Sequence, residues 1–327
     1  MSARARIFWA FAAIYLVWGS TYLGIRVAVE TLPPFLLAGV RFLVAGAVLY
    51  LWARWQGEAR PGPATWRRGF FLGALFFLFG NGIVVWAERH VPSGRTALLA
   101  STSPLWTTVI ESARRGWQRP PGRVVLGVAL GIAGLALLAV PGRSVGEPRV
   151  SALGLIGISF ASIAWSIGSV QVHARHLPGS ASMATAVKML GGGAQLLVVG
   201  TLLGELQGFR IEAVSWRSVT ALAYLIGFGS IIGFSSFTYL LRVTTPAKVA
   251  TSSYINPVVA VVLGWALADE VVTGRTLVAA AVIVGGVLLI RLGERRAPEP
   301  DELEGVPEAA SMEDGEYPVG TERSVQP

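Results

Sequence analysis

The chain contains no cysteine and few charged residues. Without cysteine it can form neither a disulfide nor a thiolate metal site. Only 14% of its 327 residues are charged and 53% are hydrophobic, whereas an ordinary soluble domain carries about 25% charged residues. A soluble protein of this length would also spread charge over all its surface helices, but here the charges lie between long apolar runs. The scarcity of charge therefore argues against a soluble domain.

Ten apolar runs separate the charged segments. A bilayer core about 30 Å thick needs about 20 apolar residues per helix, and runs that are apolar throughout do not fit the alternating pattern of a membrane barrel. The sequence therefore predicts an all-α integral membrane protein with ten transmembrane helices. The runs cover residues 7–29, 34–54, 69–88, 93–111, 123–140, 151–170, 181–204, 217–240, 246–268 and 273–292.

The distribution of charge predicts the orientation of these helices. The net charge of +8 combines +15 over residues 1–293 with −7 over residues 294–327. With the N-terminus inside, the inner loops and ends hold 16 Lys and Arg residues and the outer loops hold 7. Cytoplasmic loops of membrane proteins carry this excess, so we expect both termini in the cytoplasm. The basic excess is interpreted as this orientation signal and not as a nucleic-acid surface.

The C-terminal segment, residues 294–327, is acidic and rich in proline. It has too few apolar residues to bury a core. We therefore expect a disordered cytoplasmic tail, and a regulatory or partner-binding segment is the alternative.

The two halves of the chain resemble each other in sequence. At an offset of 147 residues, "LLAGVRFLVAGAVL" (36–49) aligns with "MATAVKMLGGGAQL" (183–196), so that Arg41 falls on Lys188 and Trp18 on Trp165. Further along, Pro104 falls on Pro257. We expect a first repeat over residues 1–147 and a second over 148–293, with five helices in each. Because five is odd, the second repeat enters the membrane from the opposite side, an arrangement common in secondary transporters.

Three segments carry a family resemblance: "YLVWGSTYLGIRVAVETLPPFLLAGVRFLVAG" (15–46), "GNGIVVWAERHVPSGRTALLASTSPLWT" (80–107) and "YINPVVAVVLG" (254–264). They resemble the EamA family of the drug/metabolite transporter superfamily, in particular its YedA-type exporters. The resemblance implies a ten-helix inverted-repeat bundle in a prokaryotic plasma (inner) membrane that exports small metabolites or drugs. It also implies a central cavity lined mainly by the first, third, fourth, sixth, eighth and ninth helices.

Polar and aromatic residues inside spans are functional candidates by default. Mid-span tryptophans can line a cavity, where they would bind flat or cationic apolar solutes, or they can simply pack helices together. The residues that we expect to line a substrate cavity are Trp18, Ser20, Tyr22, Asn81, Trp86, Trp165, Ser169, Tyr239, Tyr254 and Asn256.

A second group of residues is predicted to serve gating or coupling. Proline removes a backbone donor, so mid-helix prolines would break two repeat-related helices. Glu88 is the candidate for proton coupling, although an exchanger needs no such group. Two repeat-related cations are expected to reach water from opposite ends of the bundle, with direct substrate contact as the alternative. The group consists of Arg41, Lys188, Glu88, Pro104 and Pro257.

No catalytic, metal or cofactor site is predicted. His173 and His176 have no carboxylate beside them, and Asp269 and Glu270 are expected to cap the ninth helix. The predicted function is a secondary transporter that exports amino acids, their derivatives or amphipathic drugs by alternating access. A sugar-phosphate or nucleotide-sugar exchanger and a lipid-translocating or receptor protein are the alternatives. The expected partners are a small-molecule substrate and the lipid bilayer, with no nucleic acid, and a homodimer is compatible with the sequence.

Overall fold

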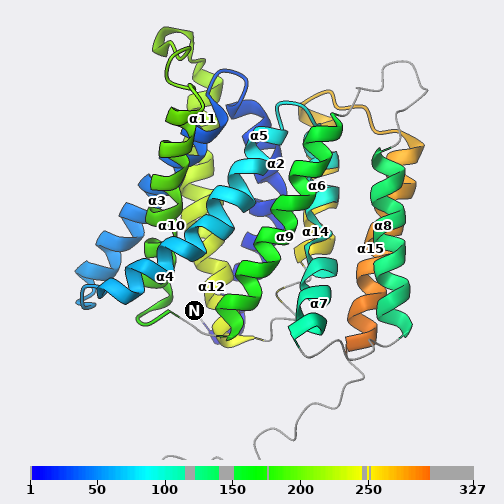
Figure 1. Cartoon of the computed structure of the whole chain (residues 1–327), viewed down its shortest axis with the longest axis horizontal. Helices are drawn as coiled ribbons and strands as arrows, with labels where there is room; N and C mark the ends of the chain where they lie inside the picture. The colour runs from blue at the N-terminus through cyan, green and yellow to red at the C-terminus, as the bar shows by residue number, and fades with distance from the viewer. Residues whose placement is uncertain are drawn as a thin grey trace, which may run out of the picture.

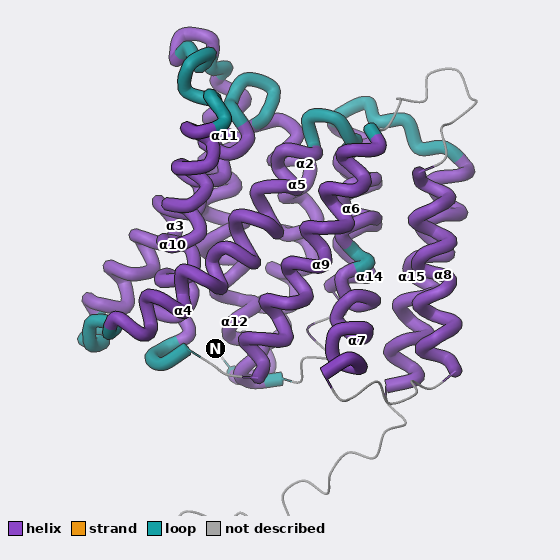
Figure 2. The backbone as a smooth tube through the Cα atoms, in the orientation of Figure 1, coloured by secondary structure: helices purple, strands orange, loops and turns teal. Residues whose placement is uncertain are grey.

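The structure, a computed structural model, describes residues 2–114, 122–139, 151–174, 177–244, 249 and 252–294. Every regular element in these ranges is a helix, so the predicted all-α class is confirmed for the described part of the chain. Figures 1 and 2 show the helices as a bundle, with loops mainly at its two ends. The predicted tail beyond Glu294 lies outside the described residues.

The helices of the first half follow the predicted runs, with one exception. The predicted helix 93–111 is interrupted by a turn at Ser101 and Thr102, which leaves Pro104 in the first turn of a new helix and not halfway along one. Proline is tolerated there because the first backbone N–H groups have no intrahelical partner. The elements are α1 (Ala3–Ala12), η1 (Ala13–Val17), α2 (Trp18–Ala28), α3 (Pro34–Trp55), α4 (Pro63–Gly73), η2 (Ala74–Gly82), α5 (Ile83–Ala87), α6 (Ser93–Ala100), α7 (Ser103–Arg114) and α8 (Gly122–Ala139).

The second half also follows the predicted runs. Pro257 lies inside a helix, as predicted. The elements are α9 (Ala152–Ala174), α10 (Ala181–Leu202), the short η3 (Ile211–Ala213), α11 (Trp216–Tyr224), η4 (Leu225–Ile232), α12 (Gly233–Val243), α14 (Ser252–Leu267) and α15 (Gly274–Glu294). The segments η1, η2 and η4 are π-helical and join their flanking α-helices into three continuous helices.

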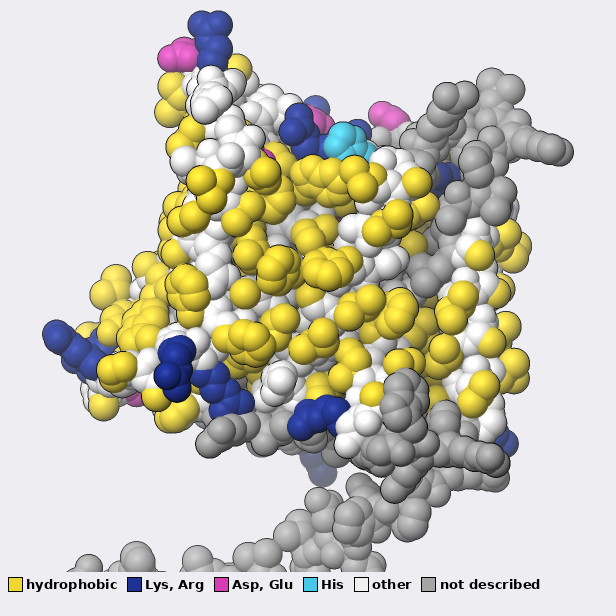
Figure 3. All heavy atoms as spheres, in the orientation of Figure 1, with side chains coloured by type: hydrophobic (Ala, Val, Ile, Leu, Met, Phe, Trp, Pro, Cys, Tyr) yellow, Lys and Arg dark blue, Asp and Glu magenta, His cyan; other side chains and the backbone are white. Residues whose placement is uncertain are grey.

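In the part of the chain that the structure describes, six helices are long and apolar enough to cross a membrane, judged by length and composition. They are Arg4–Ala28, Pro34–Trp55, Pro63–Ala87, Ala152–Val172, Ala181–Leu202 and Trp216–Leu240, and shorter apolar helices lie at Gly122–Gly134, Ile255–Leu267 and Gly274–Ile290. Figure 3 shows hydrophobic side chains over the middle of one face, with Lys and Arg along its lower edge and a mixed charged group at its upper edge. This distribution matches an apolar belt between two polar ends.

Two antiparallel helix pairs make close backbone contacts. In the pair α3–α10, a Cβ on Gly46 would lie 3.0 Å from the nitrogen of Leu190, and one on Gly193 would lie 2.9 Å from the nitrogen of Leu43. The order of these contacts makes the pair antiparallel. In a membrane, helices gain little by packing apolar side chains against each other instead of against lipid. They associate through small residues of this kind, which let the backbones approach closely.

The second close pair, α8–α15, forms one edge of the bundle (Figure 1). A Cβ on Gly127 would lie 2.5 Å from the carbonyl oxygen of Gly286, and a Cβ on Gly286 would lie 2.7 Å from that of Gly127. A Cβ on Gly134 would lie 3.3 Å from the carbonyl oxygen of Ala279. The contacts again run antiparallel, and both backbones need glycine at the crossing.

The ends of α3 and α10 are joined by reciprocal caps. Gly57 and Gly204 have φ angles of 85° and 79°, the left-handed conformation with which helices often end. The next residue after Gly57, Glu58, accepts a hydrogen bond from the backbone N–H of Ser180 at 3.0 Å, before α10. The next residue after Gly204, Glu205, accepts from the N–H groups of Phe35 and Leu36 at the start of α3. Each helix end therefore carries a carboxylate that stabilises the start of the other helix.

The glycine contact between α8 and α15 generates a matched pair of variants. Gly286→Ala would force the two backbones apart, and we expect it to lower the free energy of unfolding by about 1–3 kcal/mol, the usual cost of overpacking. The neighbouring Gly285 has no atom within 4 Å of an added Cβ, so Gly285→Ala should not destabilise the protein. Thermal unfolding in detergent, followed by circular dichroism, measures both. Equal midpoints would contradict the proposed role of the contact.

Candidate functional site

An aromatic cluster lies where helices from both halves of the chain meet. Trp18 begins α2 and Trp165 lies in α9, and their ring centroids are 6.2 Å apart at an interplanar angle of 87°. Phe234 of α12 contacts both, at 5.2 Å from Trp18 and 6.1 Å from Trp165. Edge-to-face packing is favourable because the positive edge of one ring faces the negative face of the other. The structure therefore brings together the two tryptophans that the repeat aligned.

Four further phenylalanines complete the cluster. Phe76 lies 5.0 Å from Trp165, Phe237 lies 5.0 Å from Trp18, and Phe42 and Phe77 lie 4.4 Å from each other. Sequence reasoning missed these residues, because a phenylalanine in an apolar run is not distinguished from one that faces lipid. Only the three-dimensional packing identifies them.

The π-helical segments lie beside this cluster. Trp18 directly follows η1, and its indole N–H donates to the carbonyl oxygen of Gly229 in η4 at 3.3 Å. The Asn81 amide in η2 donates to the carbonyl oxygen of Phe76 at 3.3 Å, five residues earlier. A π-helical turn changes the backbone pairing and often occurs at functional sites. Here two such turns supply carbonyl oxygens that accept bonds from predicted site residues.

The remaining π-helical segment, η1, is contacted by the ninth predicted helix. With its nitrogen facing η1, the Asn256 amide donates to the carbonyl oxygens of Ile14 and Tyr15 at 3.1 Å. Asn256, the residue before Pro257, therefore connects α14 to the first helix. The side chain of Tyr254, a predicted cavity residue, lies outside the described part of the structure.

Arg41 is buried in the interior, with 2% of its surface exposed. Its Nε donates to Ser230 Oγ at 2.8 Å, and its guanidinium carbon lies 4.9 Å from the ring centre of Phe42. The expectation that Arg41 reaches water is therefore wrong for this structure. The repeat-related cation Lys188 is half-buried, with its Nζ 5.6 Å from the ring centre of Phe76. Each cation thus packs against one ring of the aromatic cluster.

Glu88 follows α5 and is fully buried. Neither oxygen of its carboxylate has a hydrogen-bond partner among the described residues, and the same holds for Nη1 of Arg41. The Arg26 guanidinium donates to the backbone carbonyl of Glu88 at 3.1 Å instead of to its carboxylate. Glu88 lies within electrostatic range of Arg26, Arg41, Tyr22 and Glu270. These residues form what we call the buried polar layer.

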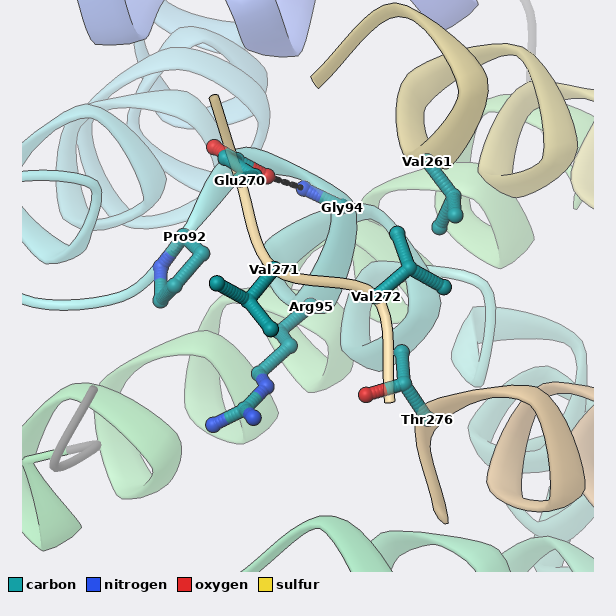
Figure 4. Close-up of a pocket in the computed structure, with 8 residues that line it drawn as sticks. All are labelled: Pro92, Gly94, Arg95, Val261, Glu270, Val271, Val272 and Thr276. Atoms are coloured by element: carbon teal, nitrogen blue, oxygen red, sulfur yellow. Dashed lines mark hydrogen bonds between the residues drawn. The ribbon is translucent and has the colours of Figure 1, made fainter. Parts of the chain in front are cut away.

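Glu270 caps two helices. Its backbone N–H donates to the carbonyl oxygen of Gly264 at 3.1 Å, at the end of α14 as predicted, and its side chain caps a second helix. Its Oε1 accepts from the backbone N–H and the hydroxyl of Ser93, both at 2.7 Å, and its Oε2 accepts from the N–H of Gly94 at 3.1 Å. Figure 4 shows the carboxylate directed at the start of α6, beside Pro92. Glu270 therefore joins the segment after α14 to α6, because the free N–H groups of a helix start attract a carboxylate.

An open groove of about 490 Å³ lies between α2, α11 and α14. At one wall the hydroxyls of Ser20 and Tyr224 share a hydrogen bond. The other lining residues are Leu23, Gly24, Val27, Arg217, Thr220, Ala221, Leu263 and Leu267. Of the predicted cavity residues, Ser20 is the one that lines this groove.

Three remaining predicted residues make other contacts. Ser169 donates to the carbonyl oxygen of Trp165 at 2.9 Å. Trp86 packs edge-on against His90 at 5.5 Å. Tyr239 belongs to a separate hydrophobic cluster with Ile14 and Leu240. Among the described residues no group of three or more His, Asp or Glu side chains could hold a metal ion.

Comparisons with known proteins identify relatives along nearly the whole chain. The profile of the EamA-like transporter family matches residues 5–140 and 152–292. The uncharacterized inner membrane transporter YedA of Escherichia coli (strain K12) is 36% identical over 315 residues, which cover 94% of this chain and 97% of that protein. A probable terminal-alkyne amino-acid exporter of Streptantibioticus cattleyicolor is 27% identical over 293 residues, covering 88% of this chain and 95% of that protein.

The fold is similar to that of solved structures, among them one crystal structure. It superimposes with a TM-score of 0.61 at 21% sequence identity and covers 89% of this chain and 99% of the matched chain. This similarity supports the arrangement of the helices alone.

The cap on α6 can be tested through stability. Glu270→Ala leaves two backbone N–H groups and one hydroxyl without their acceptor, and we expect a loss of about 1–3 kcal/mol in the free energy of unfolding. Glu212→Ala is the control, because that carboxylate is exposed. Thermal unfolding in detergent should separate the two variants by several degrees. A Glu270→Ala midpoint equal to that of the control would contradict the cap.

Proposed function

Because this chain belongs to the EamA-like transporter family, we propose that it is a secondary transporter that exports small metabolites across the plasma membrane by alternating access. The names of the family and of the relatives indicate a transporter and not an enzyme. The observation that carries the proposal is the meeting of Trp18 and Trp165 at the centre of the bundle, one from each half of the chain. Amino acids, their derivatives and amphipathic drugs are the proposed substrate classes.

We propose that the two halves are inverted repeats that together make ten spans, with boundaries at 1–147 and 148–293. The contact of Gly46 with Leu190 has a counterpart 147 residues along in the contact of Gly193 with Leu43. The Gly-Glu pair that ends α3 recurs at the same offset at the end of α10, as residues 57–58 and 204–205. An antiparallel contact between equivalent helices is what a two-fold axis in the membrane plane requires.

The π-helical segments extend this support to the third and eighth helices, whose sequences do not align. In both, a π-helical stretch lies between two α-helical parts, at η2 (Ala74–Gly82) and η4 (Leu225–Ile232). The third and eighth helices therefore share this irregularity, whereas η1 of the first helix has no counterpart in α9.

For orientation, we propose that both termini face the cytoplasm. The N-terminus and the end of α15 lie at the same, lower edge of the bundle (Figure 1). Lys and Arg side chains gather along that edge in the view of Figure 3. Cytoplasmic ends of membrane proteins carry this positive excess.

The proposed binding region is the aromatic cluster with the polar residues above it. The glycine contacts of α3–α10 and α8–α15 would act as fixed joints, because their backbones touch. The π-helical segments and the turn at Ser101–Thr102 would be the places where the interior helices change shape. Glu88 stays a predicted coupling group, and a homodimer stays a prediction.

Two alternatives are less well supported. A sugar-phosphate or nucleotide-sugar exchanger needs several cations near its substrate, and the cluster has Arg41 and Lys188, with Arg26 above them. A lipid translocase is favoured by one observation, the open apolar groove between α2, α11 and α14. Such a protein would move labelled phospholipid between leaflets of a vesicle without any soluble substrate.

The transporter proposal is tested by counterflow in liposomes. Purified protein is reconstituted, and amino acids, cationic drugs and sugar phosphates are each loaded inside while uptake of the labelled solute is followed. We expect at least one amino acid or drug to give counterflow. Lipid scrambling without counterflow by any solute would reject the proposal.

The role of the cluster is tested in the same assay. Trp18→Ala and Trp165→Ala should each lower the initial counterflow rate by about tenfold or more, equivalent to about 1.4 kcal/mol of lost interaction. Trp55→Ala is the matched control, because 78% of the Trp55 surface is exposed. Rates in the first two variants that equal the control rate would exclude the cluster from substrate binding.

A further inference from the structure

The buried polar layer holds two opposite charges that are incompletely paired. Glu88 is fully buried and both of its carboxylate oxygens lack a hydrogen-bond partner among the described residues. Arg41 is 2% exposed, and its Nη1 also has no hydrogen-bond partner among the described residues. The two side chains lie within electrostatic range but do not hydrogen-bond to each other.

Nearby residues do not supply the missing partners. The Arg26 guanidinium is bonded to the backbone carbonyl of Glu88. Glu270 uses both of its oxygens on the start of α6. Burying charged groups without hydrogen bonds is costly, so such groups are normally paired. The Glu88 carboxylate can therefore accept a hydrogen bond from one further cationic group, and Nη1 of Arg41 can donate one to a further anionic group.

The aromatic cluster adjoins Arg41 directly. Arg41 bonds to Ser230, and the preceding residue, Gly229, accepts the indole N–H of Trp18. A Cβ on Gly229 would lie 3.0 Å from Nη2 of Arg41. A ligand held by Arg41 would therefore place its remaining atoms beside Trp18 and Phe42.

We propose that Arg41 and Glu88 form a binding pair for zwitterions: Nη1 of Arg41 receives a carboxylate, Glu88 receives an ammonium, and an apolar side chain packs on the aromatic cluster. This inference rests on the proposed transport function and specifies how its substrate is recognised. A zwitterion satisfies both groups without adding net charge to the interior. A simple amine or a simple acid satisfies one group and leaves the other buried without a partner.

Competition binding to purified protein in nanodiscs tests the pair. Labelled L-phenylalanine is displaced by unlabelled L-phenylalanine, by phenethylamine, which lacks the carboxylate, and by 3-phenylpropionate, which lacks the ammonium. A lost charged hydrogen bond corresponds to about 10- to 100-fold in affinity. We expect each half-analogue to bind the wild-type protein more weakly than L-phenylalanine by a factor in this range.

The variants should relax this preference in a crossed pattern. Arg41→Gln should bring phenethylamine to within about threefold of L-phenylalanine without helping 3-phenylpropionate, since only the carboxylate partner is removed. Glu88→Gln should do the reverse. Arg41→Lys and Glu88→Asp keep the charges and should keep the preference. The exposed residues Arg89 and Glu30 provide the controls Arg89→Gln and Glu30→Gln, which should match wild type.

Each outcome decides between the two proposals. If wild-type protein gives counterflow but binds the half-analogues as well as L-phenylalanine, the binding pair is rejected and the transporter proposal stands. If the variants unfold at lower temperature but keep the wild-type preference, the two residues are an internal charge pair only. If a variant does not fold, the comparison of the three probes on wild-type protein decides. If wild-type protein gives no counterflow with any solute of the wider panel, both proposals fail.

Discussion

Helices in a bilayer gain little by burying apolar side chains against one another, so their association depends on how closely their backbones approach. In this protein Gly73 of α4 and Gly192 of α10 meet this requirement, and two antiparallel crossings also meet it, α3 with α10 and α8 with α15. At both, glycines bring the backbones so close that an added Cβ would meet peptide atoms of the facing helix. The rest of the bundle depends on these two contacts, since they hold the first half of the chain against the second.

Between these crossings lies an interior of a different character. Its helices contain π-helical stretches, aromatic rings from both halves and buried ions. Buried ions and rare backbone geometry are costly, and in membrane proteins they commonly mark substrate pathways. A carrier needs both features: close-packed helix contacts, and an interior that holds buried charges.

The sequence predicted the helices well because a span needs a long apolar run, and the expected run 34–54 became α3 at Pro34–Trp55. It also predicted that Trp18 and Trp165 are related, and they meet in space. It could not predict the π-helical segments, since one extra residue in a turn leaves the apolar pattern unchanged. Nor could it assign Glu270 to α6, which is distant in sequence. Arg41 was expected to reach water, but whether a long side chain extends outward or inward depends on partners such as Ser230, which only the fold brings close.

The reciprocal caps have a consequence for biosynthesis. The first turn of α3 receives its carboxylate from Glu205, 170 residues later along the chain than Phe35. When the ribosome has synthesised the whole first half, the backbone N–H groups at the start of α3 therefore still lack their acceptor. The glycines of α3 also have no facing helix at that stage. The first half can enter the membrane but cannot complete its packing until most of the second half has followed. Until then its interior remains open to the lipid or to whatever insertion factor shields it.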